Sequence, residues 1–169
     1  IIFTYFENGQ LKEKTNYKNG KEVSKTIFYY HDSGQLKGTT KNGKRDGLWK
    51  NYYDNGQLRS SLNYKNDKLD GLYESFYPNG QLKERKNYKN VKLDGPFERY
   101  YENGQLLWRR NYKDGVQNGL MEKFYPNSQL EYRGNYKNGK QDGVWEYFDY
   151  NGVLTKTEEY KDGEWIRNL

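Results

Sequence analysis

The chain has 169 residues, with 29 basic and 23 acidic side chains spread along its length and a formal net charge of +6. Such an interspersed pattern is typical of a solvated surface and argues against a dedicated polyanion-binding chain. Only 33% of residues are hydrophobic, 18% are aromatic and none is cysteine, which excludes a thick aliphatic core, disulfides, thiolate metal sites and a cysteine nucleophile.

Two turn signals recur along the chain and divide it into about seven units. The first is Asn-Gly or a close variant, at Asn8-Gly9, Ser33-Gly34, Asn55-Gly56, Asn79-Gly80, Asn103-Gly104, Asn127-Ser128 and Asn151-Gly152. The second, Asp-Gly or Asn-Gly, recurs every 24 residues from Asp46 to Asp142. We therefore expect one repeat domain over residues 1–169, with units at approximately 1–22, 23–45, 46–69, 70–93, 94–117, 118–141 and 142–169.

Each unit predicts a β-hairpin. In the fourth unit, an aromatic-rich run that ends at Phe76-Tyr77 is followed by Asn79-Gly80 and a second run that ends at Tyr88. This pattern indicates a type I′ turn, whose two central residues both need positive φ. A second, longer turn, Lys-Asn-Gly-Lys-x-Asp-Gly, is expected to lead into the next hairpin. The glycines predicted to be structural are Gly47, Gly56, Gly71, Gly80, Gly95, Gly104, Gly119 and Gly143.

The strand register can be predicted from charge pairs. A turn centred on Asn79-Gly80 pairs Tyr77 with Leu82 and Glu74 with Arg85. The same register pairs Glu98 with Arg109 and Glu122 with Arg133, as expected for cross-strand neighbours. By alternation, the opposite face collects the aromatic residues Trp49, Tyr53, Tyr64, Tyr73, Tyr77, Tyr88, Phe97, Tyr101, Tyr112, Tyr125 and Tyr136.

These hairpins predict an all-β fold, an elongated single-layer antiparallel sheet of about fourteen strands. With neighbouring strands ~4.8 Å apart, seven repeats should extend about 65 Å, and strand twist should curve the sheet. Tyr29-Tyr30 and Tyr147-Phe148 stand one residue further from their turns, which we interpret as capping variation. The end segments, Ile1-Ile2-Phe3 and Trp165-Ile166, predict end-to-end self-association through unpaired edges.

The sequence predicts no catalytic residue, no metal site and no cofactor. His31 is the only histidine, and its position at an irregular turn predicts a solvated loop residue. Aspartates stand singly before glycine, which is a turn preference, and no phosphate loop, zinc spacing or EF-hand loop occurs. Glutamates could converge for glycoside hydrolysis, but their recurrence in successive repeats favours a structural role. We therefore expect a protein that is not an enzyme.

The repeat resembles the variant MORN repeat of bacterial proteins, the type named YwqK among toxin–antitoxin antitoxins. The resemblance covers nearly the whole chain and is carried by Asp70-Gly71-Leu72-Tyr73, Phe76-Tyr77, Asn79-Gly80-Gln81-Leu82, Tyr88-Lys89-Asn90 and their equivalents. Departures occur at Asn118, at Ser128 and over Thr39-Thr40-Lys41. The resemblance implies a twisted single-layer sheet that acts as a scaffold or interaction module, with an antitoxin role implied by the family's name.

The tyrosines before the turns allow two interpretations. They could hold the sheet together, or they could bind a partner, because tyrosine supplies amphipathic contact area at low entropic cost. The candidate partner-binding residues are Tyr53, Tyr77, Tyr101 and Tyr125. We expect a protein partner, with this chain as an antitoxin, an immunity-type protein or a cell-envelope adaptor. The alternative is a carbohydrate- or polyanion-binding surface protein that uses its aromatic and basic face.

The charge balance, the lengths of the apolar runs and the first residue bear on the other possible partners and on the compartment. We do not expect nucleic acid, because acidic residues are nearly as common as basic ones. Membrane contact would be peripheral, since no apolar run approaches the roughly 18 residues of a spanning helix. Ile1 is not an initiator methionine and the chain starts inside a repeat, so we expect the native amino terminus to be absent. The compartment stays open between envelope, secretion and cytoplasm.

Overall fold

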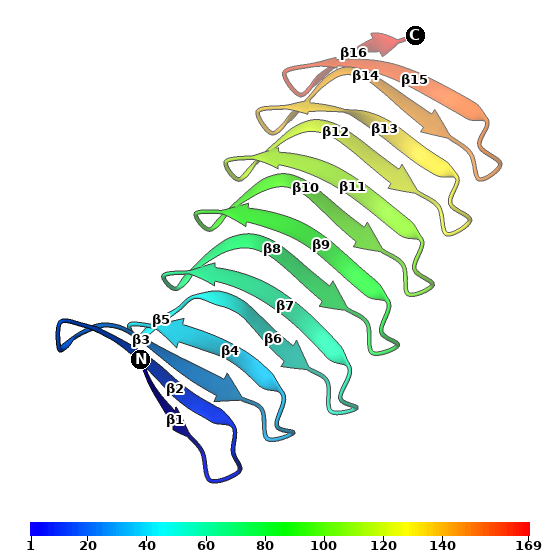
Figure 1. Cartoon of the computed structure of the whole chain (residues 1–169). Coiled ribbons are helices and arrows are strands. Elements are labelled where there is room, and N and C mark those ends of the chain that lie inside the picture. The colour runs from blue at the N-terminus through cyan, green and yellow to red at the C-terminus, as the bar shows by residue number, and fades with distance from the viewer.

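The structure is a computed structural model that describes all 169 residues. Figure 1 shows antiparallel strands side by side in chain order, in an elongated, curved ribbon one strand thick. The predicted all-β fold of tandem hairpins is confirmed. The strands are β1 (Ile2–Tyr5), β2 (Leu11–Lys18), β3 (Lys21–Tyr30), β4 (Leu36–Lys41), β5 (Lys44–Arg45), β6 (Gly47–Tyr52), β7 (Leu58–Lys65), β8 (Lys68–Phe76), β9 (Leu82–Lys89), β10 (Lys92–Tyr100), β11 (Leu106–Lys113), β12 (Val116–Phe124), β13 (Leu130–Lys137), β14 (Lys140–Phe148), β15 (Leu154–Lys161) and β16 (Glu164–Asn168).

The ribbon consists of two antiparallel sheets, and not of the one sheet of about fourteen strands that we predicted. Strands β1 to β5 form a five-stranded sheet, and β6 to β16 form an eleven-stranded one. At the junction, the Asp46 N–H donates to the Thr39 carbonyl at 3.2 Å, and the Thr39 hydroxyl donates to the Asp46 carbonyl at 2.9 Å. Pairing with β4 is interrupted at Asp46, between β5 and β6, where one backbone bond and one side-chain bond to Thr39 take the place of a regular ladder.

The turn at Asn79-Gly80 differs from the predicted type I′ turn. Only Gly80 has a positive φ, 85°, and its N–H donates to the Tyr77 carbonyl at 2.9 Å. Leu82 lies opposite Phe76 and not opposite Tyr77, because a bulge shifts the register there. This is a type I turn followed by a left-handed glycine. Pro78 fits position i+1 of this turn, because its ring fixes φ at about −65°; as the residue before a two-residue type I′ turn it would lack the N–H that the closing pair of the strands needs.

The two-residue type I′ turn lies at the other end of the hairpins. Asn90 and Val91 have φ of 49° and 64°, and they join the paired residues Lys89 and Lys92. The long second turn that we predicted is therefore wrong. Its Asp-Gly element lies within β8 instead, where the β7–β8 ladder has a bulge between Leu62 and Tyr64; Gly71, with φ 109°, faces Tyr88 on the other side. All eight glycines predicted to be structural have positive φ, between 81° and 109°.

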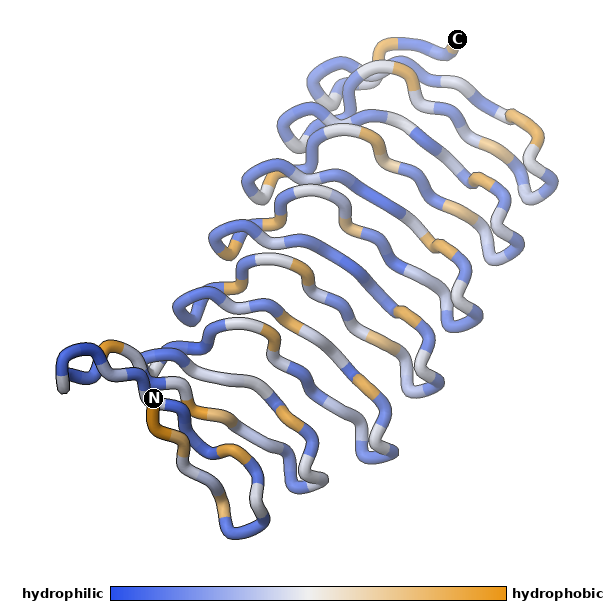
Figure 2. Tube along the Cα trace, viewed as in Figure 1, coloured by the Kyte–Doolittle hydropathy of each residue, from blue (hydrophilic) through white to orange (hydrophobic).

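The predicted strand register is confirmed at the charge pairs. The residues that lie opposite each other are Glu74 and Arg85, Glu98 and Arg109, and Glu122 and Arg133. We call the face that carries these pairs the ladder face, and the opposite face, with Tyr73, Phe97 and Trp145, the aromatic face. Met121 and Trp145, each only 2% exposed, lie on the aromatic face. Figure 2 shows short hydrophobic stretches recurring in successive hairpins between hydrophilic ones. Since Met121 and Trp145 are the only buried hydrophobic residues, the core is thin.

Candidate functional site

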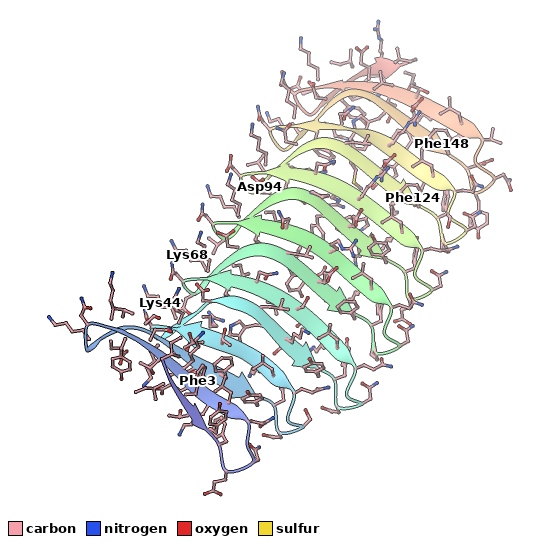
Figure 3. All side chains as sticks on the ribbon, in the orientation of Figure 1. Phe3, Lys44, Lys68, Asp94, Phe124 and Phe148 are labelled. Carbon is pink, nitrogen blue, oxygen red and sulfur yellow. The ribbon has the colours of Figure 1, made fainter.

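The four candidate tyrosines lie at one edge of the ribbon, where they link successive hairpins. Each is half-buried, and each hydroxyl donates to a backbone carbonyl 23 residues further along the chain. The bonds run from Tyr53 to Phe76 at 2.7 Å, Tyr77 to Tyr100 at 2.9 Å, Tyr101 to Phe124 at 2.9 Å and Tyr125 to Phe148 at 3.0 Å. The acceptors Phe124 and Phe148 lie along that edge, opposite the edge with Lys44 and Lys68 (Figure 3). These tyrosines therefore hold the repeats together, and their role in partner binding stays a prediction.

His31 occupies the same turn position in the second repeat. Its Nε2 lies 2.9 Å from the Lys50 carbonyl, and its ring packs edge-on against Tyr52 with centroids 5.3 Å apart. The ring is half-buried, so the predicted solvated loop residue is wrong: the histidine joins two strands much as the tyrosines do. No group of three or more His, Asp or Glu side chains lies close enough to hold a metal ion.

The ladder face carries a single row of alternating charges across seven strands, from β8 to β14. In spatial order the row runs Glu74, Arg85, Glu98, Arg109, Glu122, Arg133 and Glu146. Arg85 Nε lies 2.9 Å from Glu74 Oε1, and its Nη1 lies 4.0 Å from Glu98 Oε2. The hydrogen bond that Arg85 donates to Glu74 raises the pKa of Arg85 against the effect of burial. Sequence analysis found the pairs within hairpins but missed their continuity between hairpins.

The aromatic face combines ring pairs with cations. Phe97 and Trp108 pack edge-on with centroids 4.6 Å apart, and Arg110 lies 4.5 Å from the Trp108 ring centre. Lys86 Nζ lies 4.4 Å from the Tyr73 ring centre and 3.1 Å from Glu84 Oε1. Burial lowers the pKa of Lys86, but the hydrogen bond to Glu84 and the attraction of the Glu84 charge together outweigh it, and the net shift is upward. These contacts fix aromatic rings and positive charges in one rigid surface.

Part of the aromatic face is hollowed into a groove of about 710 Å³. We call it the serine groove, because its floor carries Ser60 and Ser75, which lie opposite each other on β7 and β8. In other repeats the same lateral row carries large side chains, such as Trp108 and Tyr132. The serine groove was missed from the sequence because it is a departure from the repeat. The signal that could have found it is a small residue at a position that is large elsewhere.

A second groove, of about 780 Å³, lies at the amino-terminal end of the ribbon. It is lined mainly by rings of β1 to β3, including Tyr5, Phe6, Phe28 and Tyr30. The structure contains no helix long and apolar enough to span a membrane.

Comparison with known proteins identifies the repeat. A family model described as "MORN repeat variant" matches about three quarters of the chain, over residues 1–19, 45–66, 69–90, 93–114, 117–138 and 141–162. No curated protein matches the chain. The unmatched residues 20–44 contain most of the second unit, where the sequence departs from the pattern and next to which the sheet breaks.

Two solved structures have limited likeness to the chain. A mutant of S. aureus TarM, in complex with fondaparinux, alpha-GlcNAc-glycerol and UDP, is 14% identical with a TM-score of 0.37, and the likeness covers 58% of this chain and 20% of that one. A porin-like protein from Bacteroides uniformis is 7% identical with a TM-score of 0.22, covering 99% of this chain and 86% of that one. Nothing about fold or function is inferred from either likeness.

Proposed function

This chain belongs to the MORN repeat variant family, and we propose that it is a non-enzymatic scaffold that binds another protein through its aromatic face. The observation that carries the proposal is a contiguous set of rings and cations, including Phe97, Trp108, Arg110 and Tyr132, on a face that no second layer of the chain covers. Aromatic residues and arginine are the side chains most enriched at the centres of protein interfaces.

The rigidity of this face supports the proposal further. Tyr132 packs against both Trp145 and Tyr147, with ring centroids 6.0 Å apart in each case. Rings already held in place lose little conformational freedom on binding, so less of the contact energy is lost to ordering. The ladder face offers a partner fewer free charged groups, because its arginines are already paired with glutamates.

We propose that this chain acts as an antitoxin, an immunity-type protein or a cell-envelope adaptor. Its partner is then the protein that it binds in that role. The antitoxin alternative is supported by the resemblance to the YwqK type, and the adaptor alternative by the elongated form of the ribbon. Both require one extended face that contacts a macromolecule, so one experiment tests what they share.

Site-specific photo-crosslinking in the source cells tests the proposal. A photoreactive phenylalanine analogue replaces Tyr132 on the aromatic face or its neighbour Arg133 on the ladder face, so the two probes differ in face and hardly in position. We expect one defined protein adduct from position 132 and little from position 133. Equal adducts from both positions, or adducts from position 133 alone, would overturn the proposal. A glycan adduct without protein would favour the carbohydrate alternative.

A further inference from the structure

The serine groove concentrates positive charge that the fold does not neutralise. Its basic side chains are Arg59, Lys83 and Arg99, and none of the three has a carboxylate within 4.0 Å. The only acidic residue in its lining is Glu84, whose Oε1 already lies 3.1 Å from Lys86 Nζ. Elsewhere on the strands, arginines such as Arg85 are paired across the sheet. The groove therefore attracts an anion from outside the chain.

The same groove presents groups that can bind carboxylate oxygens. Lys83 Nζ lies 5.5 Å from the Tyr77 ring centre and the Arg59 guanidinium 5.9 Å from that of Tyr53, so rings hold both cations over the face. Ser60 Oγ accepts a hydrogen bond from Asn51 Nδ2 at 3.1 Å, which leaves the serine's own O–H free to donate. Arginine forks match carboxylates in two-point hydrogen bonds.

The geometry points to an acidic segment of the protein partner as the occupant of the serine groove, with Arg59, Lys83 and Arg99 as its carboxylate-binding residues. This inference rests on the proposed protein-binding function and names the chemistry that it recognises. The groove volume, about 710 Å³, lies within the range of roughly 300–1,000 Å³ typical of ligand pockets, so it suits a short segment.

The surroundings favour a short acidic peptide over a long polyanion. A nucleic acid or sulfated glycan would need basic residues in a continuous track. The lateral row of the groove instead continues from Arg99 to the neutral ring of Trp108. Nearby Lys123 is already paired with Glu131 at 2.9 Å. Arg110 lies outside the groove lining, with its guanidinium against the Trp108 ring. The three cations of the groove thus form a local cluster, and the adjoining rings can contact apolar residues that flank the carboxylates.

Peptide binding to the full chain tests this inference. The probes are a fluorescent peptide with three glutamates between apolar residues and a matched peptide with glutamines, measured by anisotropy at physiological salt. We expect the acidic peptide to bind at least about tenfold more tightly, because three exposed charge contacts of about 0.5 kcal/mol each amount to roughly one decade. Equal binding of the two peptides would overturn the inference.

Two groove variants and a control locate the binding. Arg59→Gln, Lys83→Gln and Arg99→Gln together should abolish the preference for the acidic peptide. The control, Lys89→Gln, Lys113→Gln and Lys137→Gln, removes three exposed charges near the type I′ turns and should change affinity less than about twofold at this ionic strength. An equal loss in the control would mean general electrostatics and would overturn the inference.

The second variant, Ser75→Tyr, keeps every charge and fills the groove. The fold tolerates tyrosine in this lateral row, since Tyr147 occupies the equivalent position in β14. We expect the same loss of acidic-peptide binding with an unchanged melting temperature. Binding that survives filling, or tighter groove-dependent binding of a heparin fragment or single-stranded DNA, would overturn the inference. If crosslinks still form from position 132 but no acidic peptide binds, this inference is wrong and the proposed function is unaffected.

Discussion

Val91 has φ 64° in the turn between β9 and β10, a left-handed conformation that β-branched residues rarely adopt. Gly115 and Gly139 hold the equivalent position in later repeats. We expect Val91→Gly to increase the free energy of unfolding by about 1 kcal/mol, because left-handed backbone costs an L residue roughly 1–2 kcal/mol. Urea unfolding measures the change. The control, Val144→Gly, alters an exposed strand valine and should destabilise by about 0.5–1 kcal/mol. A loss from both substitutions would contradict the assignment of strain.

Gly134 lies directly against the indole of Trp145. A Cβ at position 134 would lie 2.2 Å from Trp145 Cδ2, and this tryptophan is only 2% exposed. We expect Gly134→Ala to destabilise the protein by about 2–3 kcal/mol, because a packed ring cannot move without strain. Thermal unfolding of a double-mutant cycle with Trp145→Phe checks the cause, since the smaller ring should reduce the cost of the alanine. Strictly additive losses would show that the two side chains do not interact.

Deprotonation of the Tyr100 hydroxyl is expected to lower the stability of the fold at alkaline pH. Burial, helped by the hydrogen bond that its hydroxyl donates to Glu98 Oε2 at 2.8 Å, raises the pKa of Tyr100 to about 12. The unfolded value is about 10, so this contribution to stability is complete below about pH 10 and is lost as pH rises through about 12. We expect the melting temperature to fall more steeply over that window in the wild type than in Tyr100→Phe. Parallel curves would refute this linkage.

At the scale of the strands, the charge row makes its members depend on one another. Exchanging Glu98 and Arg109 would place Arg beside Arg85 and Glu beside Glu122, two like-charge contacts. We expect this exchange to lower the free energy of unfolding by about 1–2 kcal/mol, which is more than the exchange of an isolated exposed pair would. Exchanging Arg133 and Glu146, at the end of the row, creates only one like-charge contact and should cost about half as much. Equal costs in chemical denaturation would mean that the pairs act independently.

The hairpin register could be predicted from the sequence, but the turn types could not. Charge pairs such as Glu74 and Arg85 define the register because a shift by one residue would move every side chain to the other face. Asn-Gly and its variants occur at both ends of the hairpin, and the dipeptide alone does not decide which turn is type I′. The flanking residues decide it, since Pro78 suits position i+1 of a type I turn and has no N–H to close a two-residue turn, whereas Lys89 pairs directly with Lys92 at the other end.

The candidate face was partly accessible from the sequence. Alternation predicts the shared face of Tyr73 and Phe97, because successive residues of a strand point to opposite sides. The hydroxyl bonds of tyrosines such as Tyr77 could not be predicted, because they join residues 23 apart through the stacking of hairpins. The serine groove is lined by residues of five neighbouring strands, β6 to β10, which no single repeat encodes.

At the scale of the whole molecule, each strand contacts little beyond its neighbours, so stability is close to a sum of local terms. The interrupted ladder between β4 and β6 is the weakest junction in that sum, because these two strands meet largely through side-chain bonds from residues such as Thr39 and Trp49. The outermost strands, β1 and β16, are exposed along their whole lengths. End-to-end self-association through these strands stays a prediction.

The two faces of the molecule have different roles in this account. The ladder face is satisfied internally by its alternating charges, and the edge tyrosines join the hairpins. The aromatic face holds both the ring cluster around Trp108 and the serine groove, which adjoin in one lateral row. One partner with an acidic segment flanked by apolar residues can therefore contact both.

The most direct test of the account is the affinity of the crosslinked partner for two variants, measured by isothermal titration calorimetry. One variant carries Trp108→Ala and Tyr132→Ala on the aromatic face, and the other carries Glu98→Gln and Arg109→Gln on the ladder face with net charge unchanged. We predict that the first weakens binding by at least about 100-fold, as expected when two aromatic anchors are lost. The second should change the affinity by less than about threefold. A large loss from the ladder variant with none from the aromatic variant would contradict the account.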